Sequence, residues 1–204
     1  SVDTFGRYNL VTSVVTIFSF LPDIGIGLVV VREIAKKNYD VSSLLGNTFL
    51  LTGIMSIVTI LIVIAFGLLA GFSNDVMLLL FVSSLTLLFS QIRSVPLFYF
   101  DGMENMGYSA ILKALNSLSF IAFGILGFVL GFGLVGIITG FLVGSIVSFA
   151  ITWIVFLAKK IKISFKLEKK ITKHLIYNGL PLGVAAFSAL IYSNIDGIML
   201  ERML

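Results

Sequence analysis

The chain has 204 residues, of which 58% are hydrophobic and 12% are charged, and its formal net charge is +4. Soluble domains carry about a quarter charged residues, so this composition indicates a membrane protein and excludes a nucleic-acid-binding domain. The absence of cysteine excludes a disulfide scaffold, and a single histidine gives no basis for a metal site or a bound cofactor.

Apolar stretches long enough to cross a bilayer predict six transmembrane helices, because each span takes roughly 20 apolar residues. In chain order, the predicted spans are residues 5–31, 44–69, 76–100, 106–130, 134–157 and 175–200. Polar or glycine-rich segments separate them. The sequence therefore predicts an all-α polytopic transmembrane helix bundle.

Basic residues orient the predicted bundle, since short cytoplasmic loops collect lysine and arginine. The first connection holds Arg32, Lys36 and Lys37, and the segment 158–173 holds seven lysines, so both are expected in the cytoplasm. We divide the chain into an N-terminal bundle (1–157), a basic cytoplasmic linker (158–173) and the first span of a C-terminal bundle (174–204). The first span then runs inward from Ser1, so we expect a fragment that lacks an earlier span.

The linker alternates apolar residues with lysines. This pattern favours contact between residues 159–173 and the headgroups of anionic membrane lipids. A solvated basic anchor that only fixes the orientation of the neighbouring spans explains the lysines equally well.

Three ionisable residues lie inside predicted spans, where each costs free energy unless it has a partner or a function. Asp23, Arg93 and Lys113 are each about 10 to 12 Å from the cytoplasmic boundary at ~1.5 Å per helical residue. Together with Gln91 and Asn116 they predict an anion-accepting vestibule. The alternative is structural: Asp23 and Arg93 form an ion pair, while Lys113 reaches the inner headgroups.

Proline and glycine mark two further features of the spans. Pro22 and Pro181 are expected to interrupt the first and last spans and to act as hinges, and broken helices often line transporter sites. Small residues recur every four positions at Gly136, Gly140 and Gly144 and continue at Ser148 and Thr152, which predicts close packing against another helix of the same bundle.

Several stretches, in their order and spacing, resemble the Wzx-type polysaccharide or O-antigen flippases of the MATE-like exporter superfamily. They are Phe5-Gly6-Arg7-Tyr8, Asp23-Ile24-Gly25-Ile26-Gly27, Arg32-Glu33-Ile34-Ala35-Lys36, Gly46-Asn47, Phe100-Asp101-Gly102-Met103-Glu104, Gly179-Leu180-Pro181-Leu182 and Asn194-Ile195-Asp196-Gly197-Ile198-Met199-Leu200. The resemblance implies a MATE-like fold of two six-helix bundles. Of its expected twelve or more spans, this chain would supply about spans two to seven.

The resemblance also implies a function. Such proteins are not enzymes; they export polyprenyl-pyrophosphate-linked oligosaccharides across the plasma membrane by alternating access, alongside other polysaccharide-assembly proteins. Arg93, Lys113 and Arg32 become candidates for binding the pyrophosphate, and Gln91 and Asn116 would line the cavity. Asp23 would carry a coupling proton or sodium ion, or neutralise Arg93. Two alternatives remain: a cation-coupled multidrug exporter, and a membrane-embedded enzyme acting on lipid-linked glycans.

Overall fold

The computed structural model describes the backbone of residues 2–203 and all side chains in that range except those of 2–5, 7, 8, 187 and 189–203. These residues form helices and connections without a strand, which confirms the predicted all-α class. The helices are α1 (Val2–Phe18), α2 (Ile26–Lys36), α3 (Val41–Leu69), α4 (Asn74–Gly102), α5 (Met106–Gly127), the short π-helix η1 (Phe128–Phe132), α6 (Gly133–Ala158) and α7 (Lys169–Met203).

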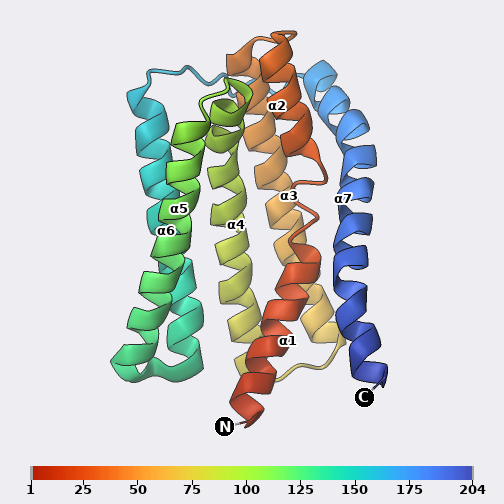
Figure 1. Ribbon diagram of the computed structural model, residues 1–204, viewed down its shortest axis with the longest axis vertical. Coiled ribbons are helices and arrows are strands. Elements are labelled where there is room, and N and C mark those ends of the chain that lie inside the picture. Colours follow the sequence, from red (N-terminus) through yellow and green to blue (C-terminus); the bar gives the residue numbers. More distant parts are fainter. Residues whose placement is uncertain (1, 204) are drawn as a thin grey trace.

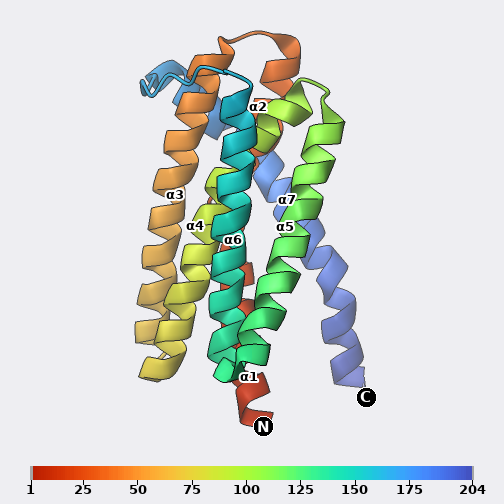
Figure 2. The same cartoon turned by 90° about the vertical axis from the view of Figure 1, so that its left-hand side faces the viewer.

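The helices run up and down in one elongated bundle (Figures 1 and 2). The end of α2, the turn between α4 and α5, the linker and the start of α7 all lie at the top of Figure 1, so the basic connections share one end. In the part of the chain that the structure describes, three helical segments are long and apolar enough to cross a membrane: Val41–Leu69, Asn74–Gly102 and Met106–Ala158. The last of these folds back at Gly131 and Gly133, which both adopt positive φ angles.

The first predicted span is divided into α1 and α2 by a non-helical segment, residues 19–25. Pro22 lies in this break, as the sequence predicts, and Ile24 and Gly25 adopt φ angles of 31° and 74°. The Asp23 carboxylate then accepts the N–H of Gly27 at 2.7 Å and so caps the start of α2. By contrast, α7 remains helical through Pro181, because a proline removes only one backbone hydrogen bond and long transmembrane helices tolerate that loss.

Two close backbone contacts explain why glycine occurs where it does. A Cβ on Gly136 or Gly140 would collide with a carbonyl oxygen of α5, belonging to Gly127 and Phe123 respectively. The predicted intrabundle packing of the glycine stripe is therefore confirmed. At the other side of the bundle, a Cβ on Gly25 would collide with the backbone of α7 at Gly179 and Gly183.

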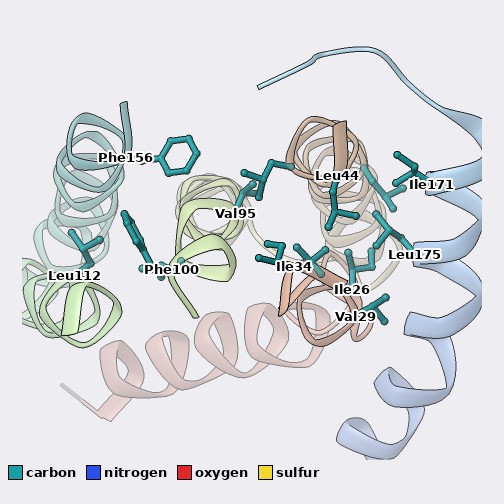
Figure 3. Packing of buried hydrophobic residues seen from close by; sticks show 14 residues of the cluster. Ile26, Val29, Ile34, Leu44, Val95, Phe100, Leu112, Phe156, Ile171 and Leu175 are labelled. Atoms are coloured by element: carbon teal, nitrogen blue, oxygen red, sulfur yellow. The ribbon is translucent and has the colours of Figure 1, made fainter. Parts of the chain in front are cut away.

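A hydrophobic core joins α2, α3, α4, α6 and α7 near the basic end (Figure 3). Ile34 of α2, Leu44 of α3 and Phe100 of α4 are all buried within it. Because α2 packs against both α4 and α7, this core fixes the broken first span between the remaining N-terminal helices and α7.

Candidate functional site

Arg93 is a buried cation in the middle of a membrane-spanning helix. Its side chain is 7% exposed, and its Nε and Nη1 atoms have no hydrogen-bond partner. A charge removed from water without a partner costs several kcal/mol. Buried polar groups in native structures are almost always hydrogen-bonded, so this exception calls for an explanation.

The neighbours of Arg93 along α4 show which face of the helix it occupies. Phe89, one turn before it, packs against Phe149 of α6 with ring centroids 5.6 Å apart. Phe98 instead meets Gly27 of α2. At ~100° per residue, Arg93 is about 40° from Phe89 and about 140° from Phe98 around the helix. Arg93 therefore lies on the face of α4 that packs against α6, away from the break between α1 and α2.

Among the described residues of α5 and α6, the helices that flank this face of α4, four further polar atoms are buried without a hydrogen-bond partner: Ser109 Oγ, Asn116 Oδ1, Ser148 Oγ and Trp153 Nε1. Asn116 on α5 and Ser148 on α6 lie nearest to the level of Arg93, counting residues from the basic end of each helix. Asn116 follows the buried Leu112 by one turn, and Ser148 follows Gly144, which packs on the backbone of α5. We call Arg93, Asn116 and Ser148 the polar seam.

Asp23 and Gln91 form hydrogen bonds at the break between α1 and α2, on the side of α4 opposite Arg93. The Gln91 amide donates a hydrogen bond to the Ser19 carbonyl at 3.3 Å, just beyond the end of α1. The Asp23 carboxylate caps α2, and within the described residues no ion pair joins it to Arg93. The ion pair expected as an alternative is thus absent, because Arg93 lies on the α6 side of α4, whereas Asp23 lies in the break between α1 and α2.

Lys113 and Arg32 each bind a carboxylate near the basic end. The Nζ atom of Lys113 lies 3.1 Å from Asp101 Oδ2, with more than half of the side chain exposed. Arg32 Nη2 lies 3.4 Å from Glu33 Oε1. The structure therefore does not bring Lys113 or Arg32 to Arg93, although all three were expected to serve one pyrophosphate.

Glu33 joins α2 to α7. Its carboxylate is buried, accepts a hydrogen bond from Asn38 at 2.9 Å, and lies 3.4 Å from His174 Nε2 on α7. It lies beyond the end of the predicted first span at residue 31. Burial raises the pKa of the Glu33 carboxyl, but the hydrogen bond from Asn38 and the nearby His174 and Arg32 outweigh it, so the pKa is lowered.

Asn47 fixes the linker to α3. Its side-chain amide donates to the carbonyl of Lys166 at 3.0 Å, and its Oδ1 accepts the backbone N–H of Glu168 at 2.8 Å and the Thr172 hydroxyl at 3.1 Å. Gly46 beside it leaves room for the Ser164 carbonyl. The linker is therefore held on the bundle rather than suspended below the membrane.

Three residues of this arrangement were missed by the sequence analysis. Ser148 was counted only as a small packing residue, Asn47 only as part of a family motif, and Pro96 was not considered. Pro96 lies inside α4 one turn after Ile92, so the Ile92 carbonyl, next to Arg93, loses its usual helical donor. The sequence did contain a signal for this site, namely a proline three residues after an arginine inside a predicted span.

Comparison with known proteins assigns the family. The family model described as "Polysaccharide biosynthesis protein" matches residues 1–204, and the chain belongs to this family. The family is that of the Wzx-type polysaccharide and O-antigen flippases, whose members are generally transporters rather than enzymes. No curated protein and no solved structure gave a match. The protein is thus a membrane protein with a flippase or transporter role in polysaccharide synthesis.

Proposed function

We propose that this member of the polysaccharide biosynthesis protein family flips polyprenyl-pyrophosphate-linked oligosaccharides outward across the plasma membrane by alternating access. The observation that carries the proposal is the polar seam. It offers a buried guanidinium with free donors on Nε and Nη1, a free amide oxygen on Asn116 and a free hydroxyl on Ser148.

A pyrophosphate-linked glycan matches these groups in type. Its phosphate oxygens accept hydrogen bonds from a guanidinium in a planar, bidentate geometry. Its sugar hydroxyls supply the donor that Asn116 Oδ1 lacks. The desolvated charge of Arg93 is costly in the empty protein, so part of that cost is recovered when an anion arrives, and this favours binding of the anionic head.

A multidrug exporter that selects organic cations requires free acidic groups within the bundle. Asp23, the carboxylate in the first span, accepts a hydrogen bond from the Gly27 N–H. The buried charge on the α6 side of α4 is positive. Both features favour an anionic cargo.

The test measures flipping of a fluorescent polyprenyl-pyrophosphate oligosaccharide by the full-length protein in proteoliposomes. We expect Arg93→Gln to slow flipping about tenfold or more, because a hydrogen bond to a charged group contributes roughly 1.5 to 3 kcal/mol. Arg93→Lys should retain part of the rate. Lys162→Gln, which removes a charge from the exposed linker, is the matched control.

Rates are normalised to the folded fraction measured by size-exclusion chromatography. Equal flipping by the wild type and by folded Arg93→Gln would contradict the role of Arg93. Transport of an organic cation by the wild-type protein, without transport of the glycolipid, would identify the exporter instead.

The coupling ion is part of the same proposal. Unwound segments of broken helices bind protons or sodium ions in transporters, and Asp23 supplies a carboxylate in such a segment. Asp23→Asn keeps an oxygen that can accept the Gly27 N–H but removes the charge. We therefore expect this variant to fold normally and to lose the dependence of flipping on a proton or sodium gradient. An unchanged gradient dependence would restrict Asp23 to capping α2.

A further inference from the structure

A cavity of about 800 Å³ opens between the end of α2 and the first turns of α7. Arg32 contributes from α2, and Lys169 and Lys173 contribute from α7. The lower part of the same cavity is lined by Ile176 and Leu180. None of the residues that line this cavity belongs to the polar seam, whose members are on α4, α5 and α6.

The positive charges at one end of the cavity are not neutralised by any described residue that lines it. Among the residues that the structure describes, no aspartate or glutamate lines it. The nearby Glu33 is buried and already bound to Arg32, Asn38 and His174. The side chain of Arg32 is still 45% exposed. The N-terminus of α7 at Lys169 adds the positive end of a helix dipole.

Polarity changes in one direction along this face of α7. Lys169 and Lys173 come first, and Ile176, Tyr177 and Leu180 follow on the same face. At ~1.5 Å per residue, the step from Lys173 to Leu180 is about 10 Å. Charge at the headgroup level with an apolar path beneath it matches a lipid, whose phosphate is at the interface and whose chain points into the bilayer.

Residues 159–168, the part of the linker before α7, are held on the bundle. Ile161 and Ile163 pack against its hydrophobic core, and Asn47 holds the backbone near Lys166. Phe165 and Leu167 are more than half exposed, and Leu167 lines the cavity. Within the range 159–173 that is expected to meet anionic lipid, Lys169 and Lys173 combine a positive charge with this cavity.

We infer that this cavity binds an anionic phospholipid of the cytoplasmic leaflet. Its phosphate contacts Arg32, Lys169 and Lys173, and one acyl chain lies along Ile176, Tyr177 and Leu180. Basic pockets between transmembrane helices at the cytoplasmic side are suited to such headgroups. The lipid is a bound partner and not the transported cargo, so the inference is independent of the flipping activity.

The test is native mass spectrometry of the full-length protein, titrated with phosphatidylglycerol or with phosphatidylcholine of the same acyl chains. We expect saturable binding of phosphatidylglycerol only. The double variant Lys169→Gln, Lys173→Gln should bind it about tenfold or more weakly, given the contribution of each cation near the membrane surface. The control, Lys160→Gln, Lys162→Gln, removes the same charge from the linker and should bind normally.

Four results would overturn the inference. They are no retention of phosphatidylglycerol by the wild type, equal retention of phosphatidylcholine, equal weakening in the linker control, and displacement of the lipid by equimolar undecaprenyl phosphate. The last would assign the cavity to the polyprenyl substrate. Size-exclusion profiles of the variants show whether each is folded, and the conservative variant Lys169→Arg, Lys173→Arg should retain binding.

Discussion

Two buried charges of this protein have opposite surroundings. Glu33 is enclosed by Arg32, Asn38 and His174, so its charge is matched by the hydrogen bond from Asn38 and by the guanidinium group of Arg32. Arg93 leaves Nε and Nη1 unmatched in a membrane-spanning helix. A buried charge that is paired with groups on two helices holds those helices together, whereas a buried charge with unpaired hydrogen-bond donors can still bind a ligand. At the scale of single residues, this difference separates the structural site from the proposed binding site.

We expect Glu33→Gln to destabilise the junction of α2 and α7 by about 1 to 3 kcal/mol at neutral pH, because the partners of a buried carboxylate lose its charge. The folded-state pKa of Glu33 is lowered from 4.5. Its contribution is therefore fully present above pH 4.5 and is lost as the pH falls through the folded-state pKa. Unfolding in detergent micelles, followed at several pH values, measures the difference from the wild type.

Glu104→Gln, at an exposed turn, is the control for Glu33→Gln and should leave stability unchanged. A difference between Glu33→Gln and the wild type that stays constant from neutral pH to well below pH 4.5 would show that the charge of Glu33 does not stabilise the fold.

At the scale of helices, α5 and α6 form the closest pair in the bundle. Their contact depends on backbone approaching backbone at Gly127, Gly136 and Gly140. In a membrane, helix association gains little from the hydrophobic effect, so packing at small residues takes its place. The polar seam borders this pair, and therefore the glycines also fix the positions of Asn116 and Ser148.

We expect Gly140→Ala to lower stability by about 1 to 3 kcal/mol, the usual cost of overpacking. The new methyl group would meet the Phe123 carbonyl, which is backbone and has no other rotamer to adopt. Gly53→Ala in α3 is the matched control, because nothing lies within 4 Å of its Cβ position. Helix propensity predicts that this control stabilises by up to about 1 kcal/mol. Equal melting temperatures for the two variants would contradict the tight packing.

At the scale of the whole molecule, the connections that carry lysine and arginine lie at one end of the bundle, together with the turn between α4 and α5 (Figure 1). The turns between α3 and α4 and between α5 and α6, which have no lysine or arginine, lie at the other end. Cytoplasmic loops collect basic residues, so the linker end is expected in the cytoplasm. The same orientation places the cationic cavity on α7 at the inner headgroups and the outer turn at Ser73 outside.

Labelling of single introduced cysteines tests this orientation. The chain contains no cysteine of its own that would react with the label. We expect Ser73→Cys to react with a membrane-impermeant maleimide added to intact cells, and Lys166→Cys to react only after the membrane is opened. Both side chains are exposed, so burial does not protect either one. Reaction of Lys166→Cys in intact cells would reverse the topology.

The sequence by itself determined the all-α class of this protein, the helices between residues 41 and 158 to within a few residues, the break at Pro22 and the close packing at Gly136 and Gly140. These follow from hydropathy, helical period and the covalent limits of proline and glycine, which act locally along the chain. Depth in the membrane also follows from counting residues, which correctly marked Arg93 as a buried charge.

Only the tertiary structure decided which charges meet. Asp23, Arg93 and Lys113 share a depth in the sequence, but the direction of a side chain depends on which helix packs on which face. Asp23 caps α2, Lys113 binds Asp101, and Arg93 lies on the α6 side of α4. Contacts between residues far apart in the chain, such as Glu33 with His174, arise from helix packing, and no local pattern in one sequence encodes them.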